Sequence, residues 1–527
     1  MQLQQYADPG AVLKTVEYFC GTTPLTLSHW KPLENLTLQM DFIWLLLGLL
    51  LCLLSIKIIN IYRAAALFPP GPTPLPFIGN LYAIQFQLHH KKLMKLSKIY
   101  GNIITVWAGQ TPMIVLNGYE TVRQCLTSNS EQLANRPTTP FFKYYSEERG
   151  IIFSNGHNWK LQRRLGLKIL RNLGLGKKNL EWRIKGEAHN LVDMFLAQKG
   201  RAIDPKQCII NAVSNVTYAV LFGHTFSLKD EIFCSIVDAS SVVTNFFGTP
   251  WGQVYDIFPW LLHHLPGPQQ TVYKALHFMK QYIRQEIKQH QQNPSSEPQD
   301  VVDYYLEYIS KAQDDPSSTI NEDNMIQLLL DFQLAGTETT TSALQWALLF
   351  LAVHQDIQVK VQKELDAFVQ STENLQYEDR LSLPYTNAVI HEIQRFSTVA
   401  PMGLPRQCTK DIEFHGYLIK KGTIIIANLD SVHMDPKQWK FPETFNPSNF
   451  LDEDGNFQSN EAFLPFSIGH RVCLGEQLAR MELFIFLTTL LKTLSFHLPQ
   501  GVTEVNMDGI FGPPLRPHPY EICAIPR

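Results

Sequence analysis

The sequence predicts a mainly α-helical protein with a small β region, preceded by one N-terminal transmembrane helix. Three observations carry this prediction. Residues 42–61 are almost entirely apolar, residues 323–353 keep a helical pattern without proline, and a glycine-flanked loop at 466–475 leads directly into a helix-forming stretch. Short strand-like segments with turn residues between them occur within residues 103–116 and supply the β region.

Composition narrows the class of protein. The chain has 527 residues, enough for one large domain or several. Hydrophobic residues at 45% and charged residues at 18% describe a globular protein with an ample apolar core. The formal net charge of -3 gives no reason to expect nucleic-acid binding. The 8 cysteines are scattered without a CxxC pair, so neither a zinc site nor a disulfide framework is indicated.

The run from Phe42 to Ile61 is predicted to cross a membrane. It has the ~20 residues that a bilayer requires, with Lys57 extending towards the headgroups. A buried core helix is the alternative, and it is disfavoured because the run has no polar face. Lys57 and Arg63 lie on its C-terminal side, whereas Glu34 and Asp41 lie on its N-terminal side. The positive-inside bias therefore places the large C-terminal portion in the cytosol.

Residues 1–41 are interpreted as a luminal extension, since no basic region precedes an apolar stretch as in a cleaved signal peptide. Asn35 begins a glycosylation sequon on this luminal side, close to the membrane. Met40 stands just before the apolar run. Our hypothesis is that the part of the chain that resembles known proteins starts at Met40, and that residues 1–39 are an extension or a start-site artefact.

Residues 62–80 are predicted to be a proline-rich linker. Prolines crowd the stretch from Phe68 to Asn80, and this density forbids helix and favours a stiff, extended chain. A docking site for another domain is the alternative. Residues 81–527 then form the large folded domain, in which Lys91–Tyr100 has the pattern of a short basic amphipathic helix.

The loop Phe466-Ser-Ile-Gly-His-Arg-Val-Cys-Leu-Gly475 is the most specific pattern in the chain. Its residue types suit a Cys473 thiolate bound to haem iron. Gly469 and Gly475 would let the backbone approach a flat macrocycle. The helix that follows would aim its free N–H groups at the sulfur and favour the thiolate over the thiol. A lone cysteine is otherwise more often a small buried hydrophobe.

This loop resembles the cysteine-ligand loop of the cytochrome P-450 monooxygenases. From Phe42 onward the chain resembles the vertebrate microsomal family 2, and within it most closely the fatty-acid-epoxidising subfamily. The resemblance implies the cytochrome P-450 fold with its long central helix, and haem b (iron protoporphyrin IX) with Cys473 as the axial ligand. Phe466 would shield the sulfur. The resemblance further assigns haem contacts to Arg136, Trp159, Arg163, Ala335, Arg406, Gly469, Arg471 and Gly475.

The threonine-rich run from Ala335 to Thr340 is a poor helix former at the centre of a helical pattern. Thr339 can bond to the carbonyl of Ala335, four residues back, beside a groove of small residues. The run resembles the family's oxygen-activation motif, which implies that Glu338 and Thr339 are catalytic, position water and relay protons to dioxygen. The alternative is a kinked helix with structural threonines.

Trp159 and Arg163 lie four residues apart on a predicted helix, so their N–H groups face the same way and can bind one carboxylate. Side chains at this spacing also often stack. The resemblance implies a haem-propionate contact. Together with Arg164, Lys168 and Arg171, Arg163 makes this segment basic. By resemblance it is a docking face for an acidic electron donor, and the alternative is an ordinary solvated face.

Glu392 and Arg395 are within ion-pair reach on a predicted helix from Tyr385 to Phe396. Most such pairs are surface features that contribute little. The resemblance implies that this one is a structural pair that braces the cysteine loop. An arginine is expected as the third partner where this chain has Thr444, so a different residue must complete the network.

Three segments are expected near the substrate from the resemblance. Arg136 opens an aromatic loop that runs to Tyr145 and caps the substrate pocket. Residues 246–268 form a mobile lid near the membrane, and residues 509–514 contact the substrate.

The implied function is a monooxygenase of the unspecific type, with residues 81–527 as its catalytic domain. It inserts one oxygen atom from O2 into lipophilic substrates, polyunsaturated fatty acids such as arachidonic acid or xenobiotics. The expected partners are NADPH–cytochrome P-450 reductase and a small b-type cytochrome, at the endoplasmic reticulum (microsomal) membrane. A haem-thiolate isomerase of peroxides is one alternative, and a non-catalytic haem-binding membrane protein is another.

Overall fold

The computed structural model describes residues 31–84, 88–174, 178–227, 229–312, 314–315, 317–369 and 375–527. The chain divides into two units, Met1–Ile61 and Tyr62–Arg527, and each is described by itself. Most of the predicted extension at 1–41, and the side chain of Asn35 with its sequon, lie outside the described residues.

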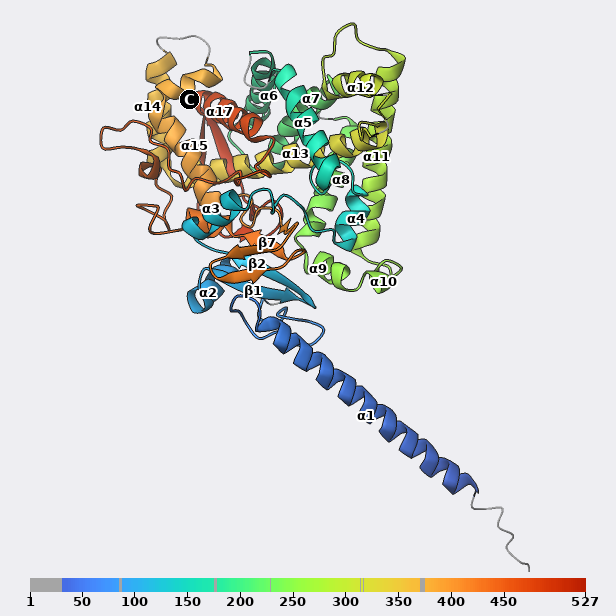
Figure 1. Ribbon diagram of the computed structural model, residues 1–527. Coiled ribbons are helices and arrows are strands. Elements are labelled where there is room, and N and C mark those ends of the chain that lie inside the picture. Colours follow the sequence, from blue (N-terminus) through green and yellow to red (C-terminus); the bar gives the residue numbers. More distant parts are fainter. Residues whose placement is uncertain are drawn as a thin grey trace, which may run out of the picture. The chain divides into compact units, whose positions relative to one another are not determined.

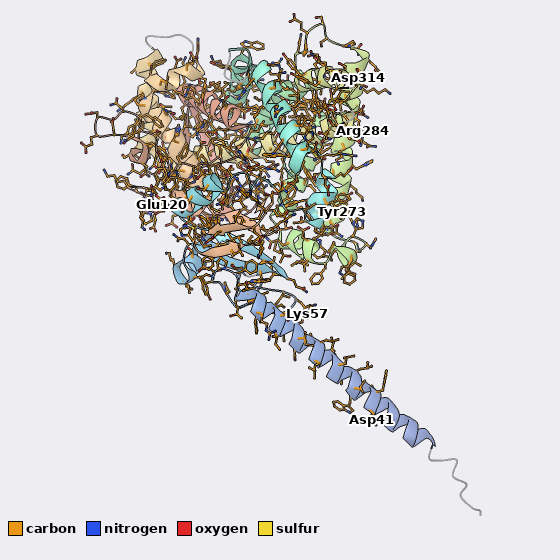
Figure 2. The ribbon with its side chains drawn as sticks, viewed as in Figure 1. Asp41, Lys57, Glu120, Tyr273, Arg284 and Asp314 are labelled. Atoms are coloured by element: carbon orange, nitrogen blue, oxygen red, sulfur yellow. The ribbon has the colours of Figure 1, made fainter. Side chains whose placement is uncertain are left out.

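The N-terminal unit contributes one long apolar helix. Helix α1 (Lys31–Ala65) is unbroken, and its part from Met40 to Ala65 is long and apolar enough to cross a membrane. Its apolar side chains point outward, with Trp44 65% exposed. Figure 2 shows Asp41 and Lys57, the charged residues at either end of the apolar stretch. The predicted transmembrane segment is therefore a continuous helix, longer than its predicted bounds.

The second unit is mainly helical, which confirms the predicted fold class. In Figure 1 the long helix α13 runs through its middle, with α7, α8, α11 and α12 to one side and α14, α15 and α17 to the other. The helices are α2 (His90–Tyr100), α3 (Tyr119–Ser128), α4 (Pro140–Ser146), α5 (Gly156–Asn172), α6 (Lys178–Leu196), α7 (Lys206–Phe222), α8 (Glu231–Phe247), α9 (Pro250–Ile257), α10 (Pro259–Leu262), α11 (Pro268–Gln292), α12 (Val301–Lys311), α13 (Glu322–Val353), α14 (Gln355–Val369), α15 (Pro384–Ser397), α16 (Leu429–His433) and α17 (Glu476–Thr493), with 3-10 turns η2 (Tyr377–Ser382) and η3 (Pro447–Phe450).

The β region consists of small sheets. A four-stranded sheet has the order β1-β2-β7-β4, in which only the β2–β7 pair is parallel. A three-stranded sheet has the order β3-β11-β8, and β5–β6 and β9–β10 are two-stranded. The strands are β1 (Ile103–Ala108), β2 (Thr111–Leu116), β3 (Ala202–Ile203), β4 (Arg406–Gln407), β5 (Ile412–Phe414), β6 (Tyr417–Ile419), β7 (Ile424–Ala427), β8 (Leu494–His497), β9 (Gly509–Ile510), β10 (Arg516–Pro517) and β11 (Ile522–Pro526).

Helix α13 is the axis of the core. Asn321 caps its N-terminus by accepting a hydrogen bond from the backbone N–H of Asn324. The helix then stays buried along most of its length and remains α-helical through the threonine-rich run. At Gly336 it lies so close to α7 that a Cβ would come 3.1 Å from Thr217 Oγ1. The predicted long helix is confirmed, and its glycine permits close helix packing.

The proline-rich stretch within residues 62–80, predicted to be a stiff linker, makes ordered contacts with the second unit. It packs along β1: Thr105 N donates to Pro70 O at 2.9 Å, and Asn80 N donates to Trp107 O at 2.7 Å. A Cβ on Gly71 would lie 2.0 Å from Thr105 O, so only glycine fits there. The prolines stiffen a segment that belongs to the folded second unit.

Two of the segments expected near the substrate are more regular than predicted. The aromatic loop after Arg136 contains a short helix, α4, with Pro140 in its first turn and Thr139 as its N-cap. Residues 246–268 form the end of α8, then α9 and α10, each of these two beginning at a proline. A proline at the first helical position costs no hydrogen bond, which explains how helices form in such proline-rich segments.

Candidate active site

The cysteine loop is a tight turn held by its own backbone. Cys473 N donates to Phe466 O at 3.0 Å, and Val472 N donates to Gly469 O at 2.9 Å. Gly469 has φ +81°, and a Cβ there would lie 2.5 Å from Leu126 O. The need for glycine at Gly469 therefore comes from the approach of α3, a reason different from the macrocycle expected from the sequence.

Cys473 lies just before α17, whose N-cap is Gly475. Protein atoms surround its sulfur, yet the side chain is accessible, and a Cβ on Gly475 would meet only open space. Burial raises the pKa of the Cys473 thiol, while the N–H groups of Gly475 and Glu476 and the Arg163 guanidinium act to lower it. The helix N-terminus thus has the predicted influence, but burial outweighs it, so a stable thiolate needs a cation at the sulfur.

Ala335 and Thr339 form an accessible stripe on the otherwise buried helix α13. Thr339 Oγ1 donates to the carbonyl oxygen of Ala335 at 2.6 Å, which confirms the predicted bond. Because the two residues are four apart, they lie on the same helix face. Small side chains here leave the helix backbone approachable, and the one hydroxyl among them is tied to the backbone.

The Glu338 side chain points away from the accessible helix face that carries Thr339. Its side chain is buried, and Glu338 Oε1 accepts a hydrogen bond of 2.7 Å from Ser241 Oγ on α8. Consecutive helical residues are rotated by about 100°, and no hydrogen bond joins Glu338 to Thr339 in the described part of the chain. The predicted acid–alcohol pair is therefore adjacent in sequence but faces two directions. Ser241, which sequence reasoning missed, is the residue that holds the acid.

Packing brings the cysteine loop and α13 together at Gly166 of α5. A Cβ on Gly166 would lie 3.2 Å from the Phe332 ring of α13 and 3.6 Å from Leu474 Cδ1. Beside it, Arg163 Nη2 donates to the carbonyl oxygen of Val472 at 2.8 Å. Gly166 on α5 is therefore a point that both the residue after Cys473 and the helix with the accessible stripe closely approach.

Four arginines from four separate segments lie near one another at this site: Arg136, Arg163, Arg406 and Arg471. Backbone carbonyl oxygens surround them, and no carboxylate in the described residues pairs with them. Burial and mutual repulsion lower the pKa values of Arg136, Arg406 and Arg471, with Arg163 among the repelling groups. None of the four forms an ion pair with a carboxylate in the described ranges. A concentration of buried positive charge is costly unless an anion completes it.

The four guanidinium groups are not equivalent. Arg471 lies 3.9 Å from the Trp159 ring centre and donates to backbone oxygens of Ala134 and Ser154. Arg406 Nη2 donates to Ser467 Oγ at 3.0 Å, while its Nη1 is buried without a partner. Arg471 is therefore satisfied by the protein itself, whereas Arg406 retains an unused buried donor, the group that an anion would complete.

The other side chains predicted to contact haem also differ in whether the protein already uses their hydrogen-bond donors. Arg136 Nη1 donates to the carbonyl oxygens of Leu404 and Pro405 at 2.8 and 2.9 Å. The Trp159 N–H makes no hydrogen bond within the described part of the chain and remains free to donate. The ring of Phe466 lies under the guanidinium of Arg480 at 5.0 Å. The Trp159 ring stacks on Arg471, a partner that the four-residue spacing to Arg163 did not reveal.

Glu392 and Arg395 form the buried pair that the sequence predicted, with both side chains 0% exposed. Arg395 also donates to backbone oxygens, including that of Thr444 at 3.1 Å. Asn449 Nδ2 and Asn446 N donate to the Glu392 carboxylate. The neutral Asn449 and backbone groups therefore complete the network where an arginine was expected.

His433 extends this network to the cysteine loop. Arg395 Nη1 donates to its carbonyl oxygen at 2.7 Å, and its ring Nε2 accepts from Leu464 N at 3.1 Å. Burial and the nearby Arg395 lower the pKa of His433 to about 3, so the ring is neutral and can accept. The ring thereby connects the buried pair to the segment that leads into Phe466. Neither periodicity nor a motif pointed to this residue in the sequence.

An aromatic cluster links two of the segments expected near the substrate. The Phe141 ring of α4 lies 4.7 Å from that of Phe246 and 5.0 Å from that of Phe247. A Cβ on Gly248 would lie 2.6 Å from the Cα of Gly512, so the C-terminal loop meets the end of α8. These three segments therefore converge on one apolar region.

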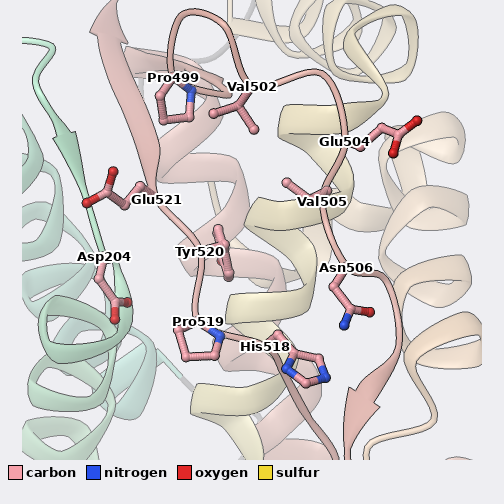
Figure 3. A pocket seen from close by; sticks show the side chains of 10 residues that line it. All are labelled: Asp204, Pro499, Val502, Glu504, Val505, Asn506, His518, Pro519, Tyr520 and Glu521. Carbon is pink, nitrogen blue, oxygen red and sulfur yellow. The ribbon is translucent and has the colours of Figure 1, made fainter.

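A surface pocket of about 480 Å³ lies elsewhere, between residues 499–506 and 518–521 (Figure 3). Asp204 also lines it, and the Tyr520 hydroxyl at its wall donates to the carbonyl oxygen of Gln345 at 2.6 Å. None of the predicted site residues lines this pocket. The candidate active site is therefore the region around Cys473, where the chemistry-bearing side chains gather.

Comparison with known proteins shows the family to which this chain belongs. The family model described as Cytochrome P450 matches residues 69–524. Cytochrome P450 2J5 of Mus musculus is 39% identical over 507 residues, covering 95% of this chain and 98% of the relative. Cytochrome P450 2J2 of Homo sapiens is 39% identical over 92% of this chain and 96% of its own length. For cytochrome P450 2F2 of Rattus norvegicus the identity is 39%, and the shares are 91% and 98%. The chain belongs to the cytochrome P450 family.

Proposed function

We propose that this chain is a haem-thiolate monooxygenase in which Cys473 is the axial ligand of haem b. Family membership identifies a haem-iron monooxygenase of lipophilic substrates. One observation carries the assignment to particular residues: Cys473 is accessible although protein surrounds it, and its loop approaches Gly166 of α5, as does the helix with the accessible pair Ala335 and Thr339.

The arginine and tryptophan N–H donors at this site fit haem, a flat macrocycle with two negatively charged propionates. The buried Arg136, Arg406 and Arg471 and the half-buried Arg163 lack a carboxylate partner in the described residues. Arg406 Nη1 is a buried donor without an acceptor. Propionates would supply the missing negative charge, with Arg163 and the free Trp159 N–H as further donors. Arg136 and Arg471 are held mainly by backbone oxygens, so they would add positive potential and fix the surrounding loops.

The haem iron, when bound, supplies the activation of O2 and the transfer of one oxygen atom to the substrate. The protein's own residues manage water and protons around that chemistry. Thr339 Oγ1 faces the accessible side of α13, where its hydroxyl can hold a water molecule or pass on a proton. Glu338, hydrogen-bonded to Ser241, is the nearest acid in sequence and serves as the proton source behind it.

The substrate region is apolar and aromatic, which supports a lipophilic substrate. Phe141, Phe246 and Phe247 converge there with the loop at 509–514. We propose polyunsaturated fatty acids such as arachidonic acid as the substrate class, from the subfamily resemblance, with xenobiotics as a second class. Hydroxylation and epoxidation are the corresponding reactions.

The electron donor is proposed to be NADPH–cytochrome P-450 reductase, with a small b-type cytochrome as a second donor. Arg164, Lys168 and Arg171 are exposed on α5, and Lys168 also lies over the Tyr308 ring at 5.0 Å. The exposed arginines therefore support a docking face for an acidic partner. We further propose attachment to the endoplasmic reticulum membrane through Met40–Ala65, with residues 66–527 in the cytosol.

The test uses the full-length chain in membranes with the reductase. The reduced, carbon monoxide-bound protein should absorb at the position typical of thiolate ligation, and Cys473→Ala should remove that band. NADPH-dependent conversion of arachidonic acid to oxygenated products should be detected by mass spectrometry. An unchanged thiolate-type spectrum in Cys473→Ala would refute the ligand assignment. Peroxide isomerisation without NADPH-driven turnover would instead favour the isomerase.

A further inference from the structure

Two helix ends meet at a cluster of metal-ligating side chains away from the candidate active site. His290 lies in the last turn of α11, Asp300 is the N-cap of α12, and Asp303 lies in the first turn of α12. One ligand atom from each of these residues lies within 4.8 Å of the others. Asp300 is buried, while His290 and Asp303 are partly accessible. None of the three residues belongs to a motif identified in the sequence.

Hydrogen bonds fix the orientation of the His290 ring within this cluster. His290 Nδ1 lies 2.8 Å from the carbonyl oxygen of Glu286, which can only accept, so Nδ1 carries a proton. The other ring nitrogen, Nε2, lies 3.0 Å from Asp300 Oδ2. A histidine whose Nδ1–H is held by a carbonyl oxygen presents Nε2 in the way that metal-bound histidines do.

Each of the two carboxylates uses one oxygen to accept a backbone N–H at the start of α12. Asp300 Oδ1 accepts from Asp303 N at 2.9 Å, as an N-cap does, and leaves Oδ2 beside His290. Asp303 Oδ2 accepts from Gln299 N at 3.1 Å, while its Oδ1 has no hydrogen-bond partner within the described ranges. The loop between α11 and α12 thus fixes both acids through one oxygen each.

The backbone leaves room for this arrangement. Gly223, the C-cap of α7, has φ +76°, and a Cβ there would lie 2.8 Å from Asp300 Oδ2. Only glycine therefore permits the Asp300 carboxylate to occupy its position. The next residue, His224, pairs with Glu286 at 3.2 Å and so has a partner of its own.

We propose that His290, Asp300 and Asp303 form a binding site for Zn²⁺. One imidazole nitrogen and two carboxylate oxygens suit zinc, whereas Ca²⁺ and Mg²⁺ prefer oxygen ligands alone. Zinc–ligand distances are about 2.0–2.2 Å, so a small rotation of the accessible Asp303 brings all three donors onto one ion. A water molecule supplies the fourth ligand. An ion pair between His290 and Asp300 would explain their contact, but it leaves Asp303 Oδ1, the oxygen that does not bond to Gln299 N, without a partner in the described ranges.

The bound ion would hold the end of α11 against the start of α12, beside the end of α7. This is a stabilising role, independent of the proposed oxygenation, since none of its ligands belongs to the candidate active site. The consequence is local: Zn²⁺ should suppress opening of the segment that connects these helices.

The test counts zinc in the haem-loaded, full-length protein without a histidine tag. After chelation and dialysis against Zn²⁺, the unaltered chain should retain one more zinc ion than either His290→Gln or Asp303→Asn. His224→Gln is the matched control, because it removes a neighbouring histidine outside the ligand set and should keep the ion. Asp300→Asn preserves the helix cap, since asparagine caps as well as aspartate, and should also lose the ion.

Hydrogen exchange gives a second, local measurement. Free Zn²⁺ at ten times its dissociation constant should slow exchange in peptides covering residues 286–304 by about tenfold, in the unaltered chain and in His224→Gln only. Equal zinc content in the unaltered chain and the His290 and Asp303 variants would overturn the proposal. So would an absence of zinc-dependent protection in that segment, since the bound zinc would then be adventitious.

Discussion

Glu392 and Arg395 are joined by two hydrogen bonds of 2.7 Å, and water reaches neither side chain. A buried charge pair of this kind is stable only because every remaining donor and acceptor is used. Here the arginine is surrounded by backbone oxygens and the carboxylate by Asn446 N and Asn449 Nδ2. The network then continues through His433 to the approach of the cysteine loop.

Replacing Arg395 with methionine should therefore destabilise the fold. The change leaves Glu392 as an uncompensated buried carboxylate, at a cost of about 3–5 kcal/mol. Thermal unfolding and the fraction of protein that retains haem measure the effect. Thr444→Ala is the control: its side chain is exposed and the network uses only its carbonyl oxygen, so we expect a change within about 0.5 kcal/mol. Equal damage from both variants would mean that the Thr444 side chain takes part in the network.

Removing the hydroxyl of Ser241 should impair proton delivery without changing the fold. Ser241→Ala takes from Glu338 the one side-chain hydrogen bond that it makes within the described residues, an interaction of about 0.5–1.5 kcal/mol. Substrate oxygenation should slow by roughly tenfold while NADPH consumption continues and peroxide accumulates. Ser235→Ala on the same helix, where the hydroxyl bonds to the backbone oxygen of Glu231, should leave the ratio of product to NADPH unchanged. An unaltered ratio in Ser241→Ala would separate Glu338 from the proton path.

Charge reversal on α5 should weaken coupling to the reductase. Arg164→Glu places a negative charge on the proposed docking face, so the reductase concentration for half-maximal turnover should rise several-fold, and most at low salt. Peroxide-supported turnover bypasses the donor and should be unaffected. Lys288→Glu makes the same charge change at an exposed position on α11 and serves as the control. If both variants raise the requirement equally, the effect comes from net charge and not from this face.

Acid should destabilise the chain through His433. The folded-state pKa of His433 is about 3, whereas an unfolded histidine has its ordinary value of 6.5. Below pH 6.5 only the unfolded chain binds this proton, so stability is complete above pH 6.5 and declines as the pH falls towards 3. At pH 5.5 the loss is about 1.4 kcal/mol.

The measurement compares the unfolding temperature of the unaltered chain and of His433→Gln at pH 7.5 and 5.5. The unaltered chain should lose more stability than the variant over this interval. Asp430 acts in the opposite sense, because its folded-state pKa is raised to about 6 by burial and its protonation favours the folded form. Since both proteins keep Asp430, the difference between them isolates His433. Identical losses would show that this ring is protonated in the folded state.

The sequence alone determined the local parts of this protein. The apolar run near Phe42, the helix through Ala335 and Thr339, and the turn before Cys473 follow from periodicity, glycine and helix propensity, which act over a few residues. The Thr339 bond to Ala335 was predictable for the same reason, because the four-residue helical repeat fixes that distance.

Tertiary structure decided everything that depends on two distant segments. Glu338 bonds to Ser241, Trp159 stacks on Arg471, and Asn449 takes the place of an arginine in the buried network. The proline-rich stretch packs on β1 because Gly71 and Asn80 match its backbone. Such pairings arise from burial, which requires every enclosed polar group to find a partner wherever the fold supplies one. Local sequence sets which groups seek partners, and the packing of the whole chain sets which partners they find.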